Sequence, residues 1–352
     1  MDTMQNNLAA IQEYYGKALS GNKDLQTGAC CSCAPLPAAQ QAILAEIDSE
    51  VLERFYGCGS PIPPAIEGCT LLDLGCGSGR DAYLAAKLVG PHGRVIGVDM
   101  TAEQLAVARR HVDSQCRRFG FAAPNVEFRQ GYIEDLAGCG IADNSIDVVI
   151  SNCVINLSPD KRRVFSEIFR VLKPGGELYF SDIFVDRRLP DSVAQDPLLR
   201  NECLGGALYI EDFRRLLQSL GCMDYRVVSK RRSELNNPEL AARLGQARCY
   251  AYTIRAFKLD CLEDICEDFG QVAWYKGTLP DAPQAFVLDD HHTFYTGKPM
   301  LVCGNSAAMV QETRFGKHFE VRGDRSTHFG PFPCGTGPAQ SDDDCACSSG
   351  CC

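Results

Sequence analysis

The sequence predicts an α/β fold, a doubly wound Rossmann-like sheet of the class I methyltransferase type, and three observations indicate it. The segment LLDLGCGSGR at residues 71–80 is an apolar strand that runs directly into a glycine-rich turn. A second apolar segment, RVIGVD at 94–99, ends in an acid. Strand and helix patterns alternate from there to about residue 258. The 352 residues suffice for one large domain and a smaller one.

The glycine turn differs from a phosphate-binding loop. Gly75, Gly77 and Gly79 read G-x-G-x-G, and Asp73 stands two residues ahead of them. A carboxylate there would repel a phosphate and attract a cation. Asp99, at the end of the second strand, is suited to accept hydrogen bonds from two ribose hydroxyls. A nucleoside with a positive charge and no phosphates describes S-adenosylmethionine, whereas a tight turn in any α/β domain would explain the glycines alone.

The other elements follow in order. We expect strands at 126–129, 146–150 and 177–181, the last after a turn at 173–176, and a final hairpin of 225–228 with 249–257. Helices are expected at 81–88 and from Thr101, as N-cap, through Val112. Residues 131–135, after the third strand, offer an apolar side chain to cover an adenine and an acid to accept its exocyclic amine.

The expected domains surround this sheet. Residues 1–66 predict a helical cap, because Leu8, Ile11 and Tyr15 have helical spacing and a second helix is expected at 38–56. Residues 67–258 form the cofactor-binding domain, with an excursion at 184–210. A small C-terminal α+β domain is expected at 259–335. The end, 336–352, is expected to be a disordered cysteine-rich tail, either a trap for soft metals or a segment with incidental thiols.

Composition narrows the function. A formal charge of −10 without a run of Lys or Arg argues against nucleic-acid and membrane-surface partners. No secretory signal or membrane-spanning stretch is recognisable, so a cytoplasmic location is expected. Yet the chain holds 20 cysteines, too many for structural disulfides in a reducing compartment, so some thiols should have chemistry of their own. Cys30 and Cys33 form C-x-x-C, but no second pair completes a zinc site.

Three further cysteines stand at informative places. Cys58 lies in a glycine turn that would expose its sulfur. Cys153 follows the fourth strand, at the sheet edge where ligands bind, and should face the reactive end of the cofactor; the alternative is a small buried apolar residue. Cys203 precedes Gly205 and Gly206, which suggest a close-packed turn that fixes the thiol.

Eight segments together resemble the arsenite S-adenosylmethionine methyltransferases: LQTGAC, FYGCGSPIP, LDLGCGSGRD, GVDM, GYIEDL, SNCVINLSPDK, LKPGGELYFSD and ECLGGALY. The likeness spans residues 10 to 258, and its cysteine-bearing segments are the most specific. It implies that trivalent arsenic is held by Cys30, Cys58, Cys153 and Cys203. It also implies that Tyr56, Asp99, Met100, Ile133, Glu134 and Asn152 line the cofactor, to which we add Gly57, Asp73, Gly75, Cys76 and Gly77 from the adjoining loops.

The chain departs from this family in two places. Cys76 stands where many relatives carry Ser. The additional Cys31 and Cys33 leave open which N-terminal sulfur is the ligand, although position favours Cys30.

The resemblance implies methylation of arsenite to mono-, di- or trimethylated arsenicals, which serves arsenic detoxification. Thiolates suit soft arsenic, and its lone pair can attack a sulfonium methyl without a general base. Oxidised thiols would be restored by glutathione or a thioredoxin-type reductant, and the chain is expected to be a monomer. Two alternatives remain. A methyltransferase for another small molecule would leave the four cysteines unexplained, and a non-catalytic sequestering protein would leave Asp73, Gly75, Gly77 and Asp99 unexplained.

Overall fold

The structure is a computed structural model that describes residues 3–18, 36–233, 235 and 237–333. Cys30, Cys31, Cys33 and the tail at 336–352 lie outside the described residues. The chain divides into two compact units. The first comprises Met1–Lys173, Leu178–Ile210 and Lys230–Thr253, and the second comprises Pro174–Glu177, Glu211–Ser229 and Ile254–Cys352.

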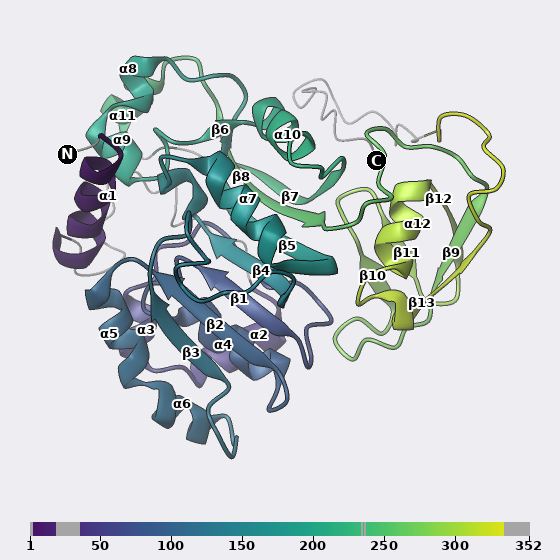
Figure 1. The fold of residues 1–352 in the computed structure, drawn as a ribbon, viewed down its shortest axis with the longest axis horizontal. Coiled ribbons are helices and arrows are strands. Elements are labelled where there is room, and N and C mark those ends of the chain that lie inside the picture. The colour runs from purple at the N-terminus through teal and green to yellow at the C-terminus, as the bar shows by residue number, and fades with distance from the viewer. Residues whose placement is uncertain (1–2, 19–35, 234, 236, 334–352) are drawn as a thin grey trace. The chain divides into compact units, whose positions relative to one another are not determined.

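The main sheet confirms the predicted Rossmann-like class. Its strand order is β3-β2-β1-β4-β5-β8-β7, and β6 pairs with β5 (Figure 1). The pairings of β1 with β2 and β4, and of β2 with β3, are parallel. The strands are β1 Thr70–Leu74, β2 Arg94–Asp99, β3 Val126–Gln130, β4 Ile146–Asn152, β5 Leu172–Val185, β6 Leu208–Tyr209, β7 Tyr225–Ser233 and β8 Cys249–Phe257.

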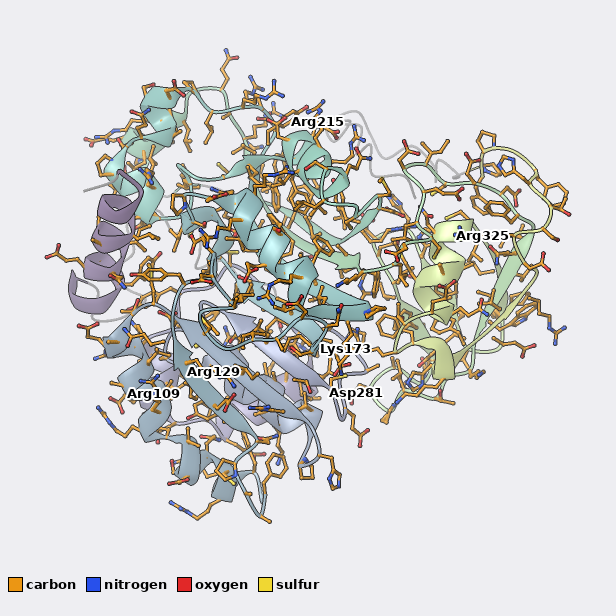
Figure 2. The ribbon with its side chains drawn as sticks, in the orientation of Figure 1. Arg109, Arg129, Lys173, Arg215, Asp281 and Arg325 are labelled. Atoms are coloured by element: carbon orange, nitrogen blue, oxygen red, sulfur yellow. A yellow bond between two sulfur atoms is a disulfide. The ribbon has the colours of Figure 1, made fainter. Side chains whose placement is uncertain are left out.

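Amphipathic helices cover the parallel strands. They are α4 Arg80–Val89, α5 Ala102–Arg110, α6 Val112–Arg118 and α7 Lys161–Val171. In α7 the buried residues Val164, Phe165, Ile168 and Val171 lie on one face, as a core-facing helix requires. Arg109 of α5, labelled in Figure 2, donates from Nε and Nη2 to the Phe128 carbonyl of β3 at 3.2 and 3.1 Å, which fixes this helix against the sheet.

The predicted helix from Thr101 through Val112 starts as expected, with Thr101 at the N-cap, but it is not continuous to Val112. The chain breaks at His111 into α5 and α6. Thr101 occupies the N-cap position but, among the described residues, its side chain makes no capping hydrogen bond. Instead, its backbone N–H donates to Asp99 Oδ1 at 2.8 Å, so the acid that ends β2 also organises the start of α5.

The N-terminal segment is helical, as predicted, in α1 Thr3–Glu13, the π-helical turn η1 Tyr14–Ala18, α2 Ala38–Ala45 and α3 Ser49–Glu53. The single helix expected at 38–56 was wrong. Asp48 interrupts it, because its carboxylate accepts from the Glu50 N–H at 3.1 Å and starts a new helix. The apolar periodicity continues across this break.

The expected turn at 173–176 was also wrong, because these residues belong to β5. The Gly175 N–H donates to the Lys258 carbonyl at 2.8 Å, and the Lys258 N–H donates to Gly176 at 2.9 Å, which extends the ladder past the end of β8. The expected pairing of the last two strands is confirmed, because β8 and β7 are neighbours in the sheet, and α11 Pro238–Leu244 lies between them in the sequence. Within the excursion, α8 Asp191–Ala194, α9 Pro197–Asn201 and β6 follow β5, and α10 Ile210–Gln218 comes next.

The second unit contains the small α+β region expected from the sequence. One sheet has the antiparallel order β12-β9-β13, and β10 pairs with β11. The elements are β9 Gln271–Tyr275, β10 Ala285–Val287, β11 Thr293–Tyr295, β12 Pro299–Val302, α12 Gly304–Gln311, the 3-10 turn η4 Gly316–His318 and β13 Phe319–Arg322. Phe286, Phe294 and Phe319 form edge-to-face pairs in its core. Arg325, labelled in Figure 2, donates to the Cys261 carbonyl at 2.6 Å.

Within the described ranges, every helix is too short or too polar to cross a bilayer.

Candidate active site

A cleft opens at the carboxyl ends of β1, β2 and β4, within the first unit. This is the edge at which open α/β sheets bind ligands. Ten residues predicted for the cofactor line it: Tyr56, Asp73, Gly75, Cys76, Gly77, Asp99, Met100, Ile133, Glu134 and Asn152. Gly57 is not among the lining residues, whereas Cys153 is.

The loop after β1 requires its first glycine. Gly75 has φ of 67°, and a Cβ built there would lie 2.4 Å from Val154. Its N–H donates to the Val98 carbonyl at 2.7 Å, which ties the loop to β2. Any side chain at this position would strain the backbone and displace Val154, so the loop can approach a ligand closely only with glycine here.

Asp99 joins the two halves of the predicted cofactor site. Its Oδ2 accepts from the Gly77 N–H at 2.9 Å, and its Oδ1 accepts from Thr101. Burial raises the pKa of this carboxyl, and the backbone N–H donors lower it in part. Asp99 also lines the cleft, where its carboxylate can accept hydrogen bonds from ligand hydroxyls.

The surroundings of Asp73 indicate whether the cleft fits a cationic cofactor. Its side chain lines the cleft and is 2% exposed, and its Oδ2 accepts no hydrogen bond within the described part of the chain. Burial, followed by the charges of Asp81 and Asp99, raises its pKa well above the ordinary value. The Asp73 carboxyl group thus has an unsatisfied oxygen and two acidic neighbours, so a positively charged ligand would stabilise its ionised form. The residues present therefore fit a positively charged nucleoside.

Asn152, at the end of β4, fastens the N-terminal loop to the sheet. Its Oδ1 accepts from the Cys58 and Gly59 N–H groups at 3.0 and 3.3 Å. Its Nδ2 donates to Asp81 Oδ2 at 2.8 Å and to the Gly59 carbonyl at 3.0 Å. The amide thus positions Cys58. Asp81 also lines the cleft, and sequence reasoning missed it, although an acid two residues after the last glycine of the loop was the available signal.

The N-terminal helices contribute a wall that the sequence did not assign to the site. Leu8, Ile11 and Tyr15, noted above only for their helical spacing, line the cleft. Gln12 Nε2 donates to the Met100 carbonyl at 2.9 Å, and Gln104 Nε2 donates to the Tyr15 carbonyl at 2.9 Å. The segment is therefore held over the loop between β2 and α5.

Two of the predicted arsenic ligands are joined in a disulfide, Cys58 to Cys153. Cys58 is only 2% exposed, so the expectation that its glycine turn would expose the sulfur was wrong. The hydrogen bonds from its loop to Asn152 draw the sulfur inward, onto β4. Cys203 is buried, and its Sγ donates to the Cys153 carbonyl at 2.9 Å. The structure thus brings together Cys58, Cys153 and Cys203, and Cys30 lies outside the described residues.

Both Cys153 and Cys203 have a strained backbone. Their φ angles are 56° and 64°, in the left-handed region that non-glycine residues rarely adopt. Each such residue costs on the order of 1 kcal/mol or more and persists only where neighbours hold it. Asn156 is one such neighbour, because its Nδ2 donates to the Cys203 carbonyl at 3.3 Å and to the Ile183 carbonyl at 2.6 Å.

Two ionisable groups lie near Asn156. Asp182 Oδ2 accepts from the Asn156 N–H at 3.1 Å, and burial raises the pKa of this carboxyl to about 7. Burial lowers the pKa of Lys161 to about 8, and the charge of Asp182 opposes that shift. Burial removes the hydration that would stabilise the charged forms of Asp182 and Lys161, and the attraction between their opposite charges partly replaces it.

We expect Gly206→Ala to disturb the Cys203 turn. A Cβ at Gly206 would lie 1.9 Å from the Asn156 carbonyl oxygen, so either Asn156 or the Cys203 turn must move. This should lower the free energy of unfolding by about 1–3 kcal/mol. Thermal unfolding and arsenite methylation should both decline. Gly68→Ala is a comparison of another kind, since its φ of 75° strains an alanine although no atom lies within 4 Å, whereas the cost at Gly206 comes from a steric clash. An unfolding midpoint for Gly206→Ala equal to that of the wild type would contradict close packing here.

The comparisons agree with this geometry. Residues 66–221 match a methyltransferase domain family, and residues 270–349 match the arsenite methyltransferase C-terminal domain family. An arsenite methyltransferase of Aquipseudomonas alcaligenes is 54% identical over 93% of this chain and 94% of that protein. The human arsenite methyltransferase is 40% identical over 89% of this chain and 83% of that protein.

A solved structure supports the same assignment. The crystal structure of CrArsM, an arsenic (III) S-adenosylmethionine methyltransferase from Chlamydomonas reinhardtii, has a TM-score of 0.83 and 54% sequence identity. The aligned region covers 85% of this chain and 100% of the CrArsM chain. With near-complete coverage at this identity, the chain belongs to the arsenite methyltransferase family.

Proposed function

We propose that this protein transfers methyl groups from S-adenosylmethionine to trivalent arsenic held by Cys58, Cys153 and Cys203, with Cys30 as the further ligand. The observation that carries the proposal is the position of Cys153. Among the described residues, Cys153 both lines the cleft, as Asp73 and Asp99 do, and belongs to the cluster of cysteine sulfurs. A ligand bound there would therefore lie next to the cofactor site.

The chain's residues would bind, orient and shield the reactants. Asp99 would accept hydrogen bonds from the ribose, and Asp73 would complement positive charge. When bound, S-adenosylmethionine supplies an electrophilic sulfonium methyl. The cysteine thiols would displace the hydroxyl groups of arsenite, each thiol proton leaving with one hydroxyl as water, and the arsenic, then held by thiolates, would direct its lone pair at the cleft. Holding the reacting atoms in line can contribute about 7 kcal/mol or more, and no general base is needed.

The predicted domains take roles in this proposal. Residues 1–66 form the cap that carries Cys30 and Cys58, and 184–210 form the arsenic-binding excursion with Cys203. Methylation by the lone pair leaves pentavalent arsenic, and two thiolates can return it to the trivalent state by forming a disulfide. Cysteine pairing of the kind seen at Cys58 and Cys153 supports a thiol reductant, glutathione or a thioredoxin-type protein. We also propose that the protein acts as a monomer in the reducing cytoplasm.

The direct test is incubation with arsenite, S-adenosylmethionine and a thiol reductant, followed by arsenic speciation. Mono- and dimethylated arsenicals should form with time. Omission of S-adenosylmethionine is the control. If the protein bound arsenite and the cofactor but produced no methylated arsenical, it would be a sequestering protein.

Turnover should depend on opening the Cys58–Cys153 disulfide. Sulfurs bonded to each other cannot ligate arsenic, so protein oxidised beforehand and freed of reductant should methylate arsenite at a rate near the blank. Adding dithiothreitol should restore the rate. The matched control is cofactor binding, which should be nearly equal in both states because the disulfide leaves Asp73 and Asp99 in place. Equal methylation rates with and without reductant would contradict thiolate capture by this pair.

A further inference from the structure

A second group of thiols lies in the second unit, outside the site described above. Cys303 is the N-cap residue of α12, and Cys266 lies close enough to its thiol for hydrogen bonding to lower the pKa of Cys303. The residue that follows each cysteine is also in contact, since the Gly304 N–H donates to the Glu267 carbonyl at 2.9 Å. Both cysteines are free and buried, with exposures of 4% for Cys266 and 0% for Cys303.

The surroundings of Cys303 differ from those of an ordinary buried cysteine. Its sulfur accepts from the Ser306 N–H at 3.4 Å, lies 3.3 Å from the Ser306 hydroxyl and lies 3.9 Å from Arg226 Nη2. The guanidinium of Arg226 is fully buried and also contacts Asp224 and Asp289 at 2.8 and 3.3 Å. The hydrogen bond from Cys266, then the charge of Arg226 and the Ser306 donors, lower the pKa of Cys303 despite its burial. A helix N-terminus, a cation and a donating thiol are the conditions that stabilise a thiolate.

We propose that Cys266 and Cys303 form a redox couple that closes reversibly to a second disulfide, with hydrogen peroxide as the oxidant. The Cys303 thiolate attacks one peroxide oxygen and expels hydroxide, which gives a sulfenic acid. The Cys266 thiol then attacks the Cys303 sulfur, and its proton leaves with the sulfenic oxygen as water. In total, two thiols and one peroxide give one disulfide and two waters. Sulfur is oxidised and peroxide is reduced.

Burial favours this chemistry over capture of a metal or an arsenical. A disulfide needs no added volume, because two hydrogen atoms leave and the sulfurs approach, whereas a bridging atom with its substituent must displace packed neighbours. Peroxide is small enough to enter during local opening of the fold. The donors that stabilise the thiolate also make the disulfide easier to reduce, so a small dithiol should reopen it.

The test is oxidation of the full chain with hydrogen peroxide, an acid quench, alkylation and non-reducing peptide mapping. We expect a peptide pair joined through Cys266 and Cys303, and its loss after treatment with dithiothreitol. Cys222 is the internal control, because it is buried in the same unit, and burial raises the pKa of its thiol to about 12. Cys303 should be oxidised at least about tenfold faster, because its thiolate fraction is larger.

Two variants then separate the roles. Cys266→Ser should leave Cys303 as a sulfenic acid that dimedone labels, since its partner is missing. Cys303→Ser keeps a helix-capping hydroxyl, and Cys266 should then stay reduced. The proposal would be overturned if Cys303 in the wild type were oxidised no faster than Cys222. It would also be overturned if Cys303 formed a disulfide with a cysteine other than Cys266. The wild-type comparison decides the matter even if a variant fails to fold.

Discussion

Cys153→Ser and Cys203→Ser are each expected to abolish methylation of both arsenite and a monomethylated trivalent arsenical, with a loss of more than about 100-fold in rate. Cys153 lines the cleft, and the Cys203 sulfur contacts the Cys153 carbonyl, so these two thiols lie together at the cofactor side. A monomethylated trivalent arsenical has two exchangeable positions, which two thiols fill. Serine is similar in size but a poor ligand for soft arsenic.

The same count of valences predicts a different outcome at the other cysteines. Arsenite has three exchangeable positions, so the first round needs a third thiolate from the N-terminal cap. Cys30 and Cys58 would supply this thiolate and its disulfide partner. Cys30→Ser or Cys58→Ser should therefore abolish methylation of arsenite and spare the monomethylated substrate. Within the described residues, no group of three His, Cys, Asp or Glu side chains is arranged to share one ion. Capture by three sulfurs thus requires that the Cys58–Cys153 disulfide open first.

Cys249→Ser is the matched control for this series. Cys249 is buried in the same apolar cluster as Cys58, Cys153 and Cys203, and burial raises the pKa of its thiol to about 11. It should retain activity on both substrates. Normal arsenite turnover by Cys58→Ser would refute the three-thiol arrangement and make Cys31 or Cys33 candidates. Activity of Cys153→Ser on either substrate would refute arsenic ligation at the sheet edge.

Local patterns predicted the parts of the fold that local interactions determine. The strand that ends at Leu74, the turn beginning at Gly75 and the acid at Asp99 follow from apolar runs and backbone requirements within a few residues. The break at Asp48 was missed because helical periodicity continues through it. The extension of β5 through Gly175 depends on pairing with Lys258, a partner far away in sequence, which no local pattern reveals.

The site shows the same division. The glycine loop, both acids and the settings of Cys58, Cys153 and Cys203 were read from sequence, and family resemblance assigned the cysteines to arsenic. The burial of Cys58 was not predicted, because it depends on the amide of Asn152, and its disulfide partner Cys153 lies 95 residues away. The contribution of Leu8 and Ile11 to the cleft was missed for the same reason. Helical spacing shows that a face is apolar, but not what that face covers.

Asp99→Ala is expected to weaken S-adenosylmethionine binding by about 10- to 150-fold, because ribose hydroxyls lose charge-assisted hydrogen bonds worth roughly 1.5–3 kcal/mol. Calorimetry measures this loss directly. Asp99 also receives the Gly77 and Thr101 N–H groups, so Asp99→Asn is the matched variant: it keeps one side-chain acceptor and removes the charge. We expect it to bind with intermediate affinity, and equal unfolding midpoints would show that the loop is intact.

The raised pKa of Asp99 adds a second, independent readout. Since burial favours the protonated form, the carboxylate is lost at a higher pH than for an ordinary Asp, and cofactor affinity should fall correspondingly early on acidification. The Asp99→Asn variant has no charge to lose at this position, so it should lack this component of the pH dependence. Unchanged affinity in Asp99→Ala would mean that the acid at the end of β2 does not hold the ribose, and Asp73 or Glu134 would then have to take that role.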